Sequence, residues 1–223
     1  MFRKYRVELK FINRLCGSVP QDKEMVKKWL DGRKPSVKPP GGRSINEINE
    51  EVIATMPDQE AENAETEKAI ALGFQVEKSG LVMRGGTLKA HVKDCARILS
   101  QNYIGKIQGE KSLNVRVTNC TMIQEYWVPI MKDGKRIAEA DGLFDKAVHL
   151  MGRFGPINAL KRIQYVEQPT LTFHWLVMKT TTDKNVVTED DLKSILTYGS
   201  VHGYAGERGD GEGRYEWTLE EVK

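Results

Sequence analysis

Apolar and polar side chains alternate strictly in two segments that lie far apart in the chain. Residues 5–11 place Tyr, Val, Leu and Phe at every second position with charged residues between them, and residues 170–177 repeat the pattern with Leu, Phe, Trp and Val. A period of two predicts β-strands that are buried on one face only. The chain is therefore expected to build a sheet that other elements cover on one side.

Two segments have the spacing of helices that could cover such a sheet. Residues 85–99 begin with two glycines and then carry apolar side chains at i, i+4, i+7 and i+11, counted from Leu88. This spacing gives a helix one continuous apolar face. A second helix is expected from residue 189 to about residue 198, because Thr188 and Asp191 can cap its first turn.

A long polar segment separates the first strand from the first helix. Residues 33–43 contain three prolines and two glycines among basic residues, which no packed element accommodates. Ser44 and Glu47 then form a capping-box pattern, and acidic residues follow at helical spacing. We expect residues 33–73 to form an acidic helical insertion that begins with an exposed basic loop.

The remaining patterns complete the expected order of elements. They predict a hairpin over 74–82, strands over 113–117, 122–128 and 214–219, a turn at Asp133-Gly134, and irregular structure over 138–163. Without the insertion the order is βαββαβ. This order predicts an α+β fold of the ferredoxin-like or RRM-like kind, in which two helices cover one face of an antiparallel sheet. The length of 223 residues fits a single domain over 1–223.

Charge is segregated along the chain although the formal net charge is only +3. Residues 1–43 carry a net charge of +8, residues 44–77 carry −8, residues 78–136 carry +7 and residues 137–223 carry −4. No apolar run approaches the ~18 residues that a membrane helix needs, and no signal peptide is recognisable. The three cysteines fit neither a disulfide framework nor a zinc site. We expect a soluble, cytoplasmic protein without a metal or another cofactor.

The segment before the last strand is the most unusual part of the sequence. Residues 199–213 contain six glycines in fifteen residues. Successive amide groups in such a loop can bind phosphate, or the segment can be a flexible surface connection. Nucleotide-binding glycine motifs need a strand before the loop and a helix after it. Here a helix precedes residues 199–214 and a strand follows them, so those motifs are excluded.

The same segment resembles the glycine-rich signature of the RAMP superfamily, the repeat-associated RNA-binding proteins of CRISPR effector complexes. Residues 203–215 end in a Gly-x-Gly-Arg-aromatic run, and residues 85–91 resemble the start of the first core helix in that family. Gly155-Pro156 before a basic segment fits loosely, and residues 4–22 resemble uncharacterised bacteriophage and prophage proteins. The resemblance implies a subunit that binds RNA or single-stranded nucleic acid and polymerises along it.

Some members of the family cut RNA with a histidine. His202 and His91 are the candidates here for a general acid or base, although a packing role for His202 and a solvated surface position for His91 are the simpler interpretations. His174 is interpreted as structural, and His149 is uninformative. No pair of histidines has the spacing of metal ligands.

Basic, aromatic and glycine residues give the candidate contacts to a nucleic acid. They are Arg33, Lys34, Lys38, Arg43, Arg84, Lys89, Lys93, Arg97, Arg153, Phe154, Lys161, Arg162, Gly203, Gly206, Arg208, Gly209, Gly211, Gly213 and Arg214. Tyr126 and Trp127 are further aromatic candidates. For Lys89, Lys93 and Arg97, which share one helix face, the alternative is an ordinary solvated charged surface.

These patterns lead to one expected function and two alternatives. The first is a non-catalytic protein of bacteriophage or mobile-element type that binds RNA or single-stranded DNA and assembles head-to-tail, as a homo-oligomer or within a ribonucleoprotein complex. The second is a metal-independent endoribonuclease that uses His202 or His91. The third is a phage structural protein, or an inhibitor that mimics a RAMP subunit, without affinity for nucleic acid.

Overall fold

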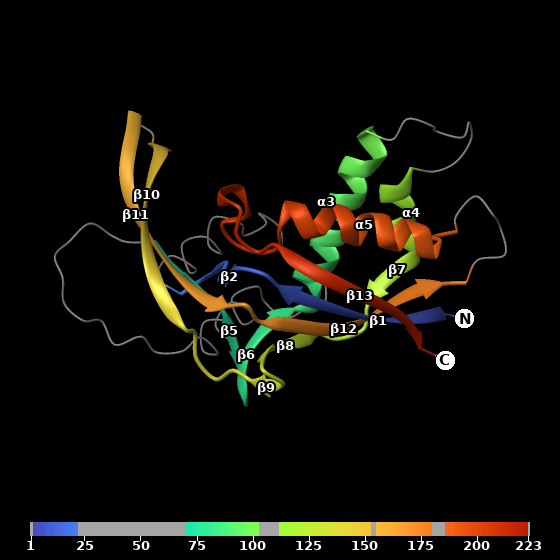
Figure 1. The fold of residues 1–223 in the computed structure, drawn as a ribbon. Helices are drawn as coiled ribbons and strands as arrows, with labels where there is room; N and C mark the ends of the chain where they lie inside the picture. The colour runs from blue at the N-terminus through green and yellow to red at the C-terminus, as the bar shows by residue number, and fades with distance from the viewer. Residues whose placement is uncertain (1, 22–69, 103–111, 153–154, 180–185, 223) are drawn as a thin grey trace, which may run out of the picture.

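The computed structural model describes residues 2–21, 70–102, 112–152, 155–179 and 186–222. In these residues the fold is a mixed α+β architecture with three α-helices and two largely antiparallel sheets (Figure 1). The expected loop over 33–43 and the rest of the insertion up to residue 69 lie outside the described residues.

The larger sheet has eight strands. They are β1 (Phe2–Phe11), β5 (Gln75–Glu77), β6 (Gly80–Arg84), β7 (Thr121–Ile123), β8 (Trp127–Lys132), β9 (Lys135–Arg136), β12 (Thr170–Met178) and β13 (Tyr215–Val222). Their order is β13-β1-β12-β8-β6-β5, with β7 paired to β12 and β9 paired to β8. The two strands expected from alternation are neighbours, because β1 pairs antiparallel with β12 and places Val7 opposite Phe173.

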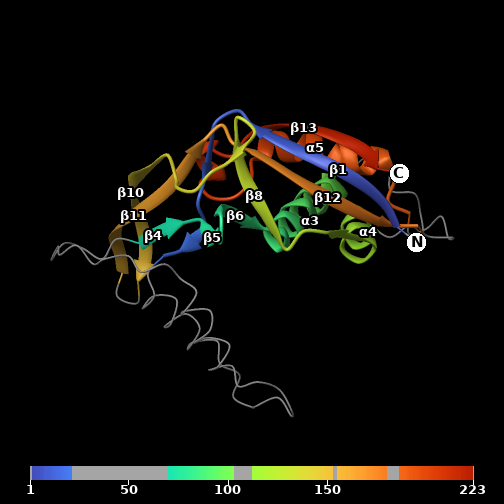
Figure 2. The ribbon, with the colours of Figure 1, turned by 90° about the horizontal axis from the view of Figure 1, so that it is seen from below.

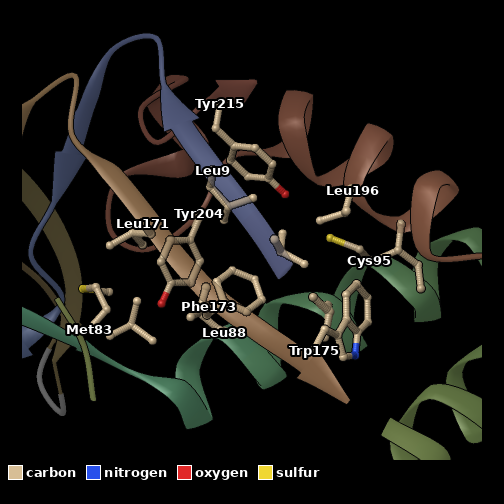
Figure 3. Close-up of a cluster of buried hydrophobic side chains, with 14 of the residues drawn as sticks. Leu9, Met83, Leu88, Cys95, Leu171, Phe173, Trp175, Leu196, Tyr204 and Tyr215 are labelled. Carbon is tan, nitrogen blue, oxygen red and sulfur yellow. The ribbon is translucent and has the colours of Figure 1, made fainter. Parts of the chain in front are cut away.

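Three helices lie on one side of this sheet: α3 (Gly85–Asn102), α4 (Leu113–Cys120) and α5 (Glu189–His202). In Figure 2, which looks from below, α3 and α5 lie behind β1 and β12. The apolar side chains of both strands point at these helices (Figure 3). Trp175, Phe173 and Leu88 are buried in this core, as the alternation and the helical spacing predict.

A second sheet of five strands projects from the first (Figure 1). It contains β2 (Arg14–Cys16), β3 (Val19–Pro20), β4 (Ile70–Gly73), β10 (Gly142–Gly152) and β11 (Gly155–Glu167). β10 and β11 form a long antiparallel hairpin, and β4 pairs with β11 in parallel. The chain enters this sheet directly from β1, so the two sheets share the connection around Asn13.

Several expectations about local structure are confirmed. The hairpin over 74–82 is present as β5 and β6, and the turn at Asp133 and Gly134 joins β8 to β9 with positive φ at both residues. Thr188 and Asp191 form a full capping box at the start of α5. The helix continues to His202, about one turn beyond the expected end.

Other expectations were wrong. Residues 113–117 are helical, because Leu113, Val117 and Cys120 share the face that packs on α3, whereas Val115 between them is exposed. Residues 138–163 are mostly the β10–β11 hairpin rather than irregular, and residues 70–73 are strand β4 rather than the end of a helix. β4 and β11 pair with each other although they lie far apart in the chain, so local patterns did not reveal these two strands. The expected strand over 122–128 is split into β7 and β8.

The close approach of α5 to α3 depends on Gly199. A Cβ at this position would lie 2.2 Å from the Tyr215 hydroxyl and 2.9 Å from Nε2 of His91. We therefore expect Gly199→Ala to destabilise the protein by about 1–3 kcal/mol, because overpacking outweighs the gain in helix propensity. Urea unfolding followed by circular dichroism measures the change.

Gly209→Ala is the matched control for this substitution. Nothing lies within 4 Å of a Cβ at Gly209, so the free energy of unfolding is expected to stay within about 0.5 kcal/mol of wild type. Equal stability of the two variants would contradict the role assigned to Gly199.

Candidate nucleic-acid interface

The glycine-rich segment is an ordered loop between α5 and β13. Gly203, Gly211 and Gly213 have positive φ, and a Cβ at Gly213 would lie 2.1 Å from the carbonyl oxygen of Tyr204. Glycine is therefore required by the path of the backbone. A short 3₁₀ helix, η2 (Arg208–Asp210), forms the exposed part of the loop.

The backbone amides of this loop are used inside the protein. Gly203 donates to Gly199, Gly206 to Cys16, Gly211 to Arg208 and Gly213 to Arg14. A phosphate cradle needs amide groups that point toward a ligand. These four glycines therefore do not form the phosphate-binding loop considered from the sequence. Gly209 lies in open space, because nothing lies within 4 Å of a Cβ placed on it.

Tyr204 anchors the loop on the core. Its ring is buried beside Phe11 and His91, and its hydroxyl is hydrogen bonded to Oγ1 of Thr87 at 2.6 Å. Burial raises the pKa of this phenol, although the hydrogen bond with Thr87 acts in the opposite direction. The contact ties the loop to the first turn of α3.

Acidic side chains of the loop form ion pairs with basic side chains of the second sheet. Glu207 has a side chain that is only 6 % exposed, and it pairs with Lys161 and, at 2.7 Å, with Lys146. Asp210 also pairs with Lys146, while Glu212 accepts a hydrogen bond from Arg14 at 2.5 Å. Lys161, a candidate nucleic-acid contact, is thus engaged in joining the β10–β11 hairpin to the loop.

His91 lies in the core and not on a solvated surface. Its Nε2 is hydrogen bonded to the Tyr215 hydroxyl at 3.0 Å, and its side chain is buried. Burial, followed by the charges of His202 and Arg208, lowers the pKa of His91 to about 3. Position 91 lies three residues after Leu88 and four before Cys95, on the apolar face itself, so the polar character of histidine and not the helical spacing concealed this burial.

The basic stripe of α3 is only partly available to a ligand. Lys89 donates to the carbonyl oxygens of Val117 and Thr121 at 2.6 Å, so it satisfies the C-terminal end of α4. Burial, and secondarily the charge of Lys93, lowers the pKa of Lys89 to about 8. Lys93 is half-buried, and Arg97 pairs with Asp94 at 2.8 Å.

Arg84 lies at the start of α3 beside an exposed aromatic ring. Its guanidinium carbon is 5.1 Å from the centroid of Tyr126, a residue that is 61 % exposed and packs edge-to-face on Trp127. α3 has no acidic residue in its first turn, and the exposed Gly86 follows Arg84 by two positions. A helix N-terminus, a guanidinium and an exposed aromatic ring therefore lie together.

The remaining candidate contacts are dispersed. Arg162 is exposed on β11 and pairs with Asp145, Arg208 pairs with Asp94 at 3.5 Å, and Arg214 is exposed at the end of the loop. The other candidates lie outside the described residues: Arg33, Lys34, Lys38, Arg43, Arg153 and Phe154. His202 is half-buried with its Nε2 3.5 Å from Asp94, and His174 is bound to Glu125 at 2.6 Å.

Within the part of the chain that the structure describes, no group of three or more His, Cys, Asp or Glu side chains has the arrangement of a metal site. No helix there combines the length and the apolar character needed to cross a membrane.

No protein-family model and no curated protein matches this chain. Among solved structures, the chain is similar to a chain of a "Type IV-B CRISPR Complex", with 10 % sequence identity and a TM-score of 0.45. The match covers 97 % of this chain and 90 % of that chain. The likeness is distant and shows no family membership, so the function is argued from the residues alone.

The carboxylate of Glu207 is the main joint between the loop and the hairpin, so Glu207→Gln is expected to loosen the hairpin. Losing one partner of this largely buried cluster should cost about 1–3 kcal/mol at neutral pH. Hydrogen–deuterium exchange should show faster exchange in β10 and β11, with β1 and β12 unchanged.

The pH dependence of the free energy of unfolding tests the same connection between Glu207 and the hairpin. Burial opposes ionisation of Glu207, but the hydrogen bonds from Lys146 and Lys161 outweigh it and lower the pKa of the carboxyl group. A lowered pKa contributes stability above the ordinary pKa of Glu, and that contribution is lost as pH falls. The difference in the free energy of unfolding between wild type and Glu207→Gln should therefore decrease below about pH 4. A gap that stays constant down to acid pH would contradict the assignment.

Proposed function

We propose that this protein is a non-catalytic, RAMP-type subunit that binds single-stranded RNA or DNA and assembles head-to-tail along the strand. The observation that carries the proposal is the pairing of Arg84 with the exposed ring of Tyr126 at the N-terminal end of α3. A guanidinium binds phosphate, and an exposed aromatic ring stacks with bases of any sequence.

The order of elements supports a ferredoxin-like core for this subunit. β13, β1, β12 and β7 are antiparallel neighbours in that order. α3 lies in the chain between β1 and β7, and α5 lies between β12 and β13. This order supports a βαββαβ core with both helices on one face, to which the second sheet would be an extension.

Charge segregation supports the assembly part of the proposal. Residues 44–77 carry a net charge of −8, between blocks of +8 and +7. In a head-to-tail assembly, an acidic segment of one subunit can bind a basic face of the next, because heterologous contacts repeat without limit. We place this assembly in the bacterial cytoplasm, as a product of a bacteriophage or mobile element.

Binding to labelled single-stranded RNA and DNA, followed by fluorescence anisotropy at about 50 mM salt, tests the proposal. Wild type should bind, and its affinity should fall steeply as salt rises. Arg84→Gln and Tyr126→Ala should each weaken binding by about 5- to 50-fold, in keeping with about 1–2.3 kcal/mol for a lost phosphate or stacking contact. Lys193→Gln removes an exposed, paired cation on α5 and should leave binding unchanged.

The same samples separate the alternatives. Denaturing gels of the incubated RNA should show no cleavage; cleavage that disappears in His202→Ala would support the endoribonuclease and contradict the non-catalytic assignment. Size-exclusion chromatography read at two wavelengths shows whether oligomers carry nucleic acid. Oligomers without affinity for either strand would favour a structural or inhibitor protein instead.

A further inference from the structure

Three side chains from separate segments converge on the carboxylate of Asp94 in α3. Arg97 of the same helix lies 2.8 Å from Oδ1, and Arg208 of the glycine-rich loop lies 3.5 Å from Oδ2. His202, at the end of α5, has its Nε2 3.5 Å from the same Oδ2. We call these four residues the Asp94 cluster.

The cluster has more positive groups than its carboxylate can satisfy. Two guanidinium groups offer ten N–H donors against the two oxygens of Asp94. The side chain of Arg97 is 51 % exposed and that of Arg208 is 43 % exposed, so both reach solvent. The hydrogen bond from Arg97, helped by the charge of Arg208 and opposed by burial, lowers the pKa of Asp94 and keeps it ionised. The cluster therefore has a net positive charge on the surface.

The surrounding structure fixes the positions of these side chains. The ring of His202 stacks on Tyr198 at 5.3 Å and lies parallel to His91 at 6.5 Å. Its Nε2 is shielded from water and has no hydrogen bond to another described residue. Arg208 begins η2, directly after Glu207, whose carboxylate is bound to the second sheet. Arg208 is thus held over α3 by the same loop that fastens the hairpin.

We propose that Arg97 and Arg208, packed beside His202, form a binding site for one backbone phosphate, and that Asp94 lowers the affinity of this site. The inference rests on the proposed function and gives Asp94 a regulatory part in it. A guanidinium binds a phosphate through paired hydrogen bonds. Asp94 competes for the same donors and repels the phosphate, so the protein releases the strand more easily than its cations alone would allow.

A purely structural ion-pair cluster predicts different behaviour. In that case Asp94→Asn would weaken the packing of the loop on α3 and would leave affinity for nucleic acid unchanged or lower. In a phosphate site, the same substitution frees Arg97 and Arg208 for the ligand and raises affinity. The sign of the change in affinity therefore distinguishes the two interpretations.

The experiment measures binding of the labelled single-stranded oligonucleotide by anisotropy at about 50 mM salt. Asp94→Asn should raise affinity by about 3- to 10-fold, and Arg208→Gln and Arg97→Gln should each lower it by a similar factor. Removal of either arginine should also reduce the slope of log affinity against log salt by about 0.7. Glu189→Gln and Lys193→Gln, which break a comparable exposed helical ion pair, are the matched controls.

The outcomes are separable from those of the proposed function. If wild type binds and the Asp94 and Arg208 variants bind like their controls, the Asp94 cluster is not a phosphate site, while the proposed function stands on Arg84 and Tyr126. If wild type binds neither RNA nor DNA, the proposed function fails and this inference fails with it. Circular dichroism of each variant verifies that it is folded.

Discussion

The packing of α5 against α3 at Gly199 is the contact on which the rest of the structure depends. The absence of a side chain there leaves room for the Tyr215 hydroxyl, which reaches the buried His91. α5 can then end at His202 directly above α3, and the loop that follows starts where Tyr204 can reach Thr87. The positions of Arg208 and of the second sheet follow from that starting point.

The loop after α5 acts as a joint between the two sheets. Its glycines give the backbone a path that other residues would strain, and the amide groups of Gly203, Gly206, Gly211 and Gly213 are consumed by that path. Its carboxylates bind lysines and an arginine of the second sheet. A glycine-rich segment can therefore be interpreted as a ligand-binding loop only when the hydrogen-bond partner of each amide is known, because the same composition also builds a rigid connection.

Folding redistributes the charge that is segregated along the chain. Lys161 and Lys146 balance the acids of the loop, and Lys89 is used at the end of α4. Several candidate cations keep solvent access, among them Arg84 beside Tyr126 at the start of α3, and Arg97 with Arg208 around Asp94 near the middle of that helix. Affinity for a polyanion would thus depend on a few placed guanidinium groups and little on net charge.

The sequence by itself determined the elements whose burial follows a local period: β1, β12, α3 and the capped start of α5. Their periods of 2 and 3.6 residues report directly which face is buried. Only the tertiary structure decided that residues 142–152 and 155–167 are paired strands and that 113–120 are helical. β11 pairs with the distant strands β2 and β4, and α4 packs on α3. These contacts, like the convergence of Arg97, His202 and Arg208 on Asp94, join separate elements and are encoded in no local pattern.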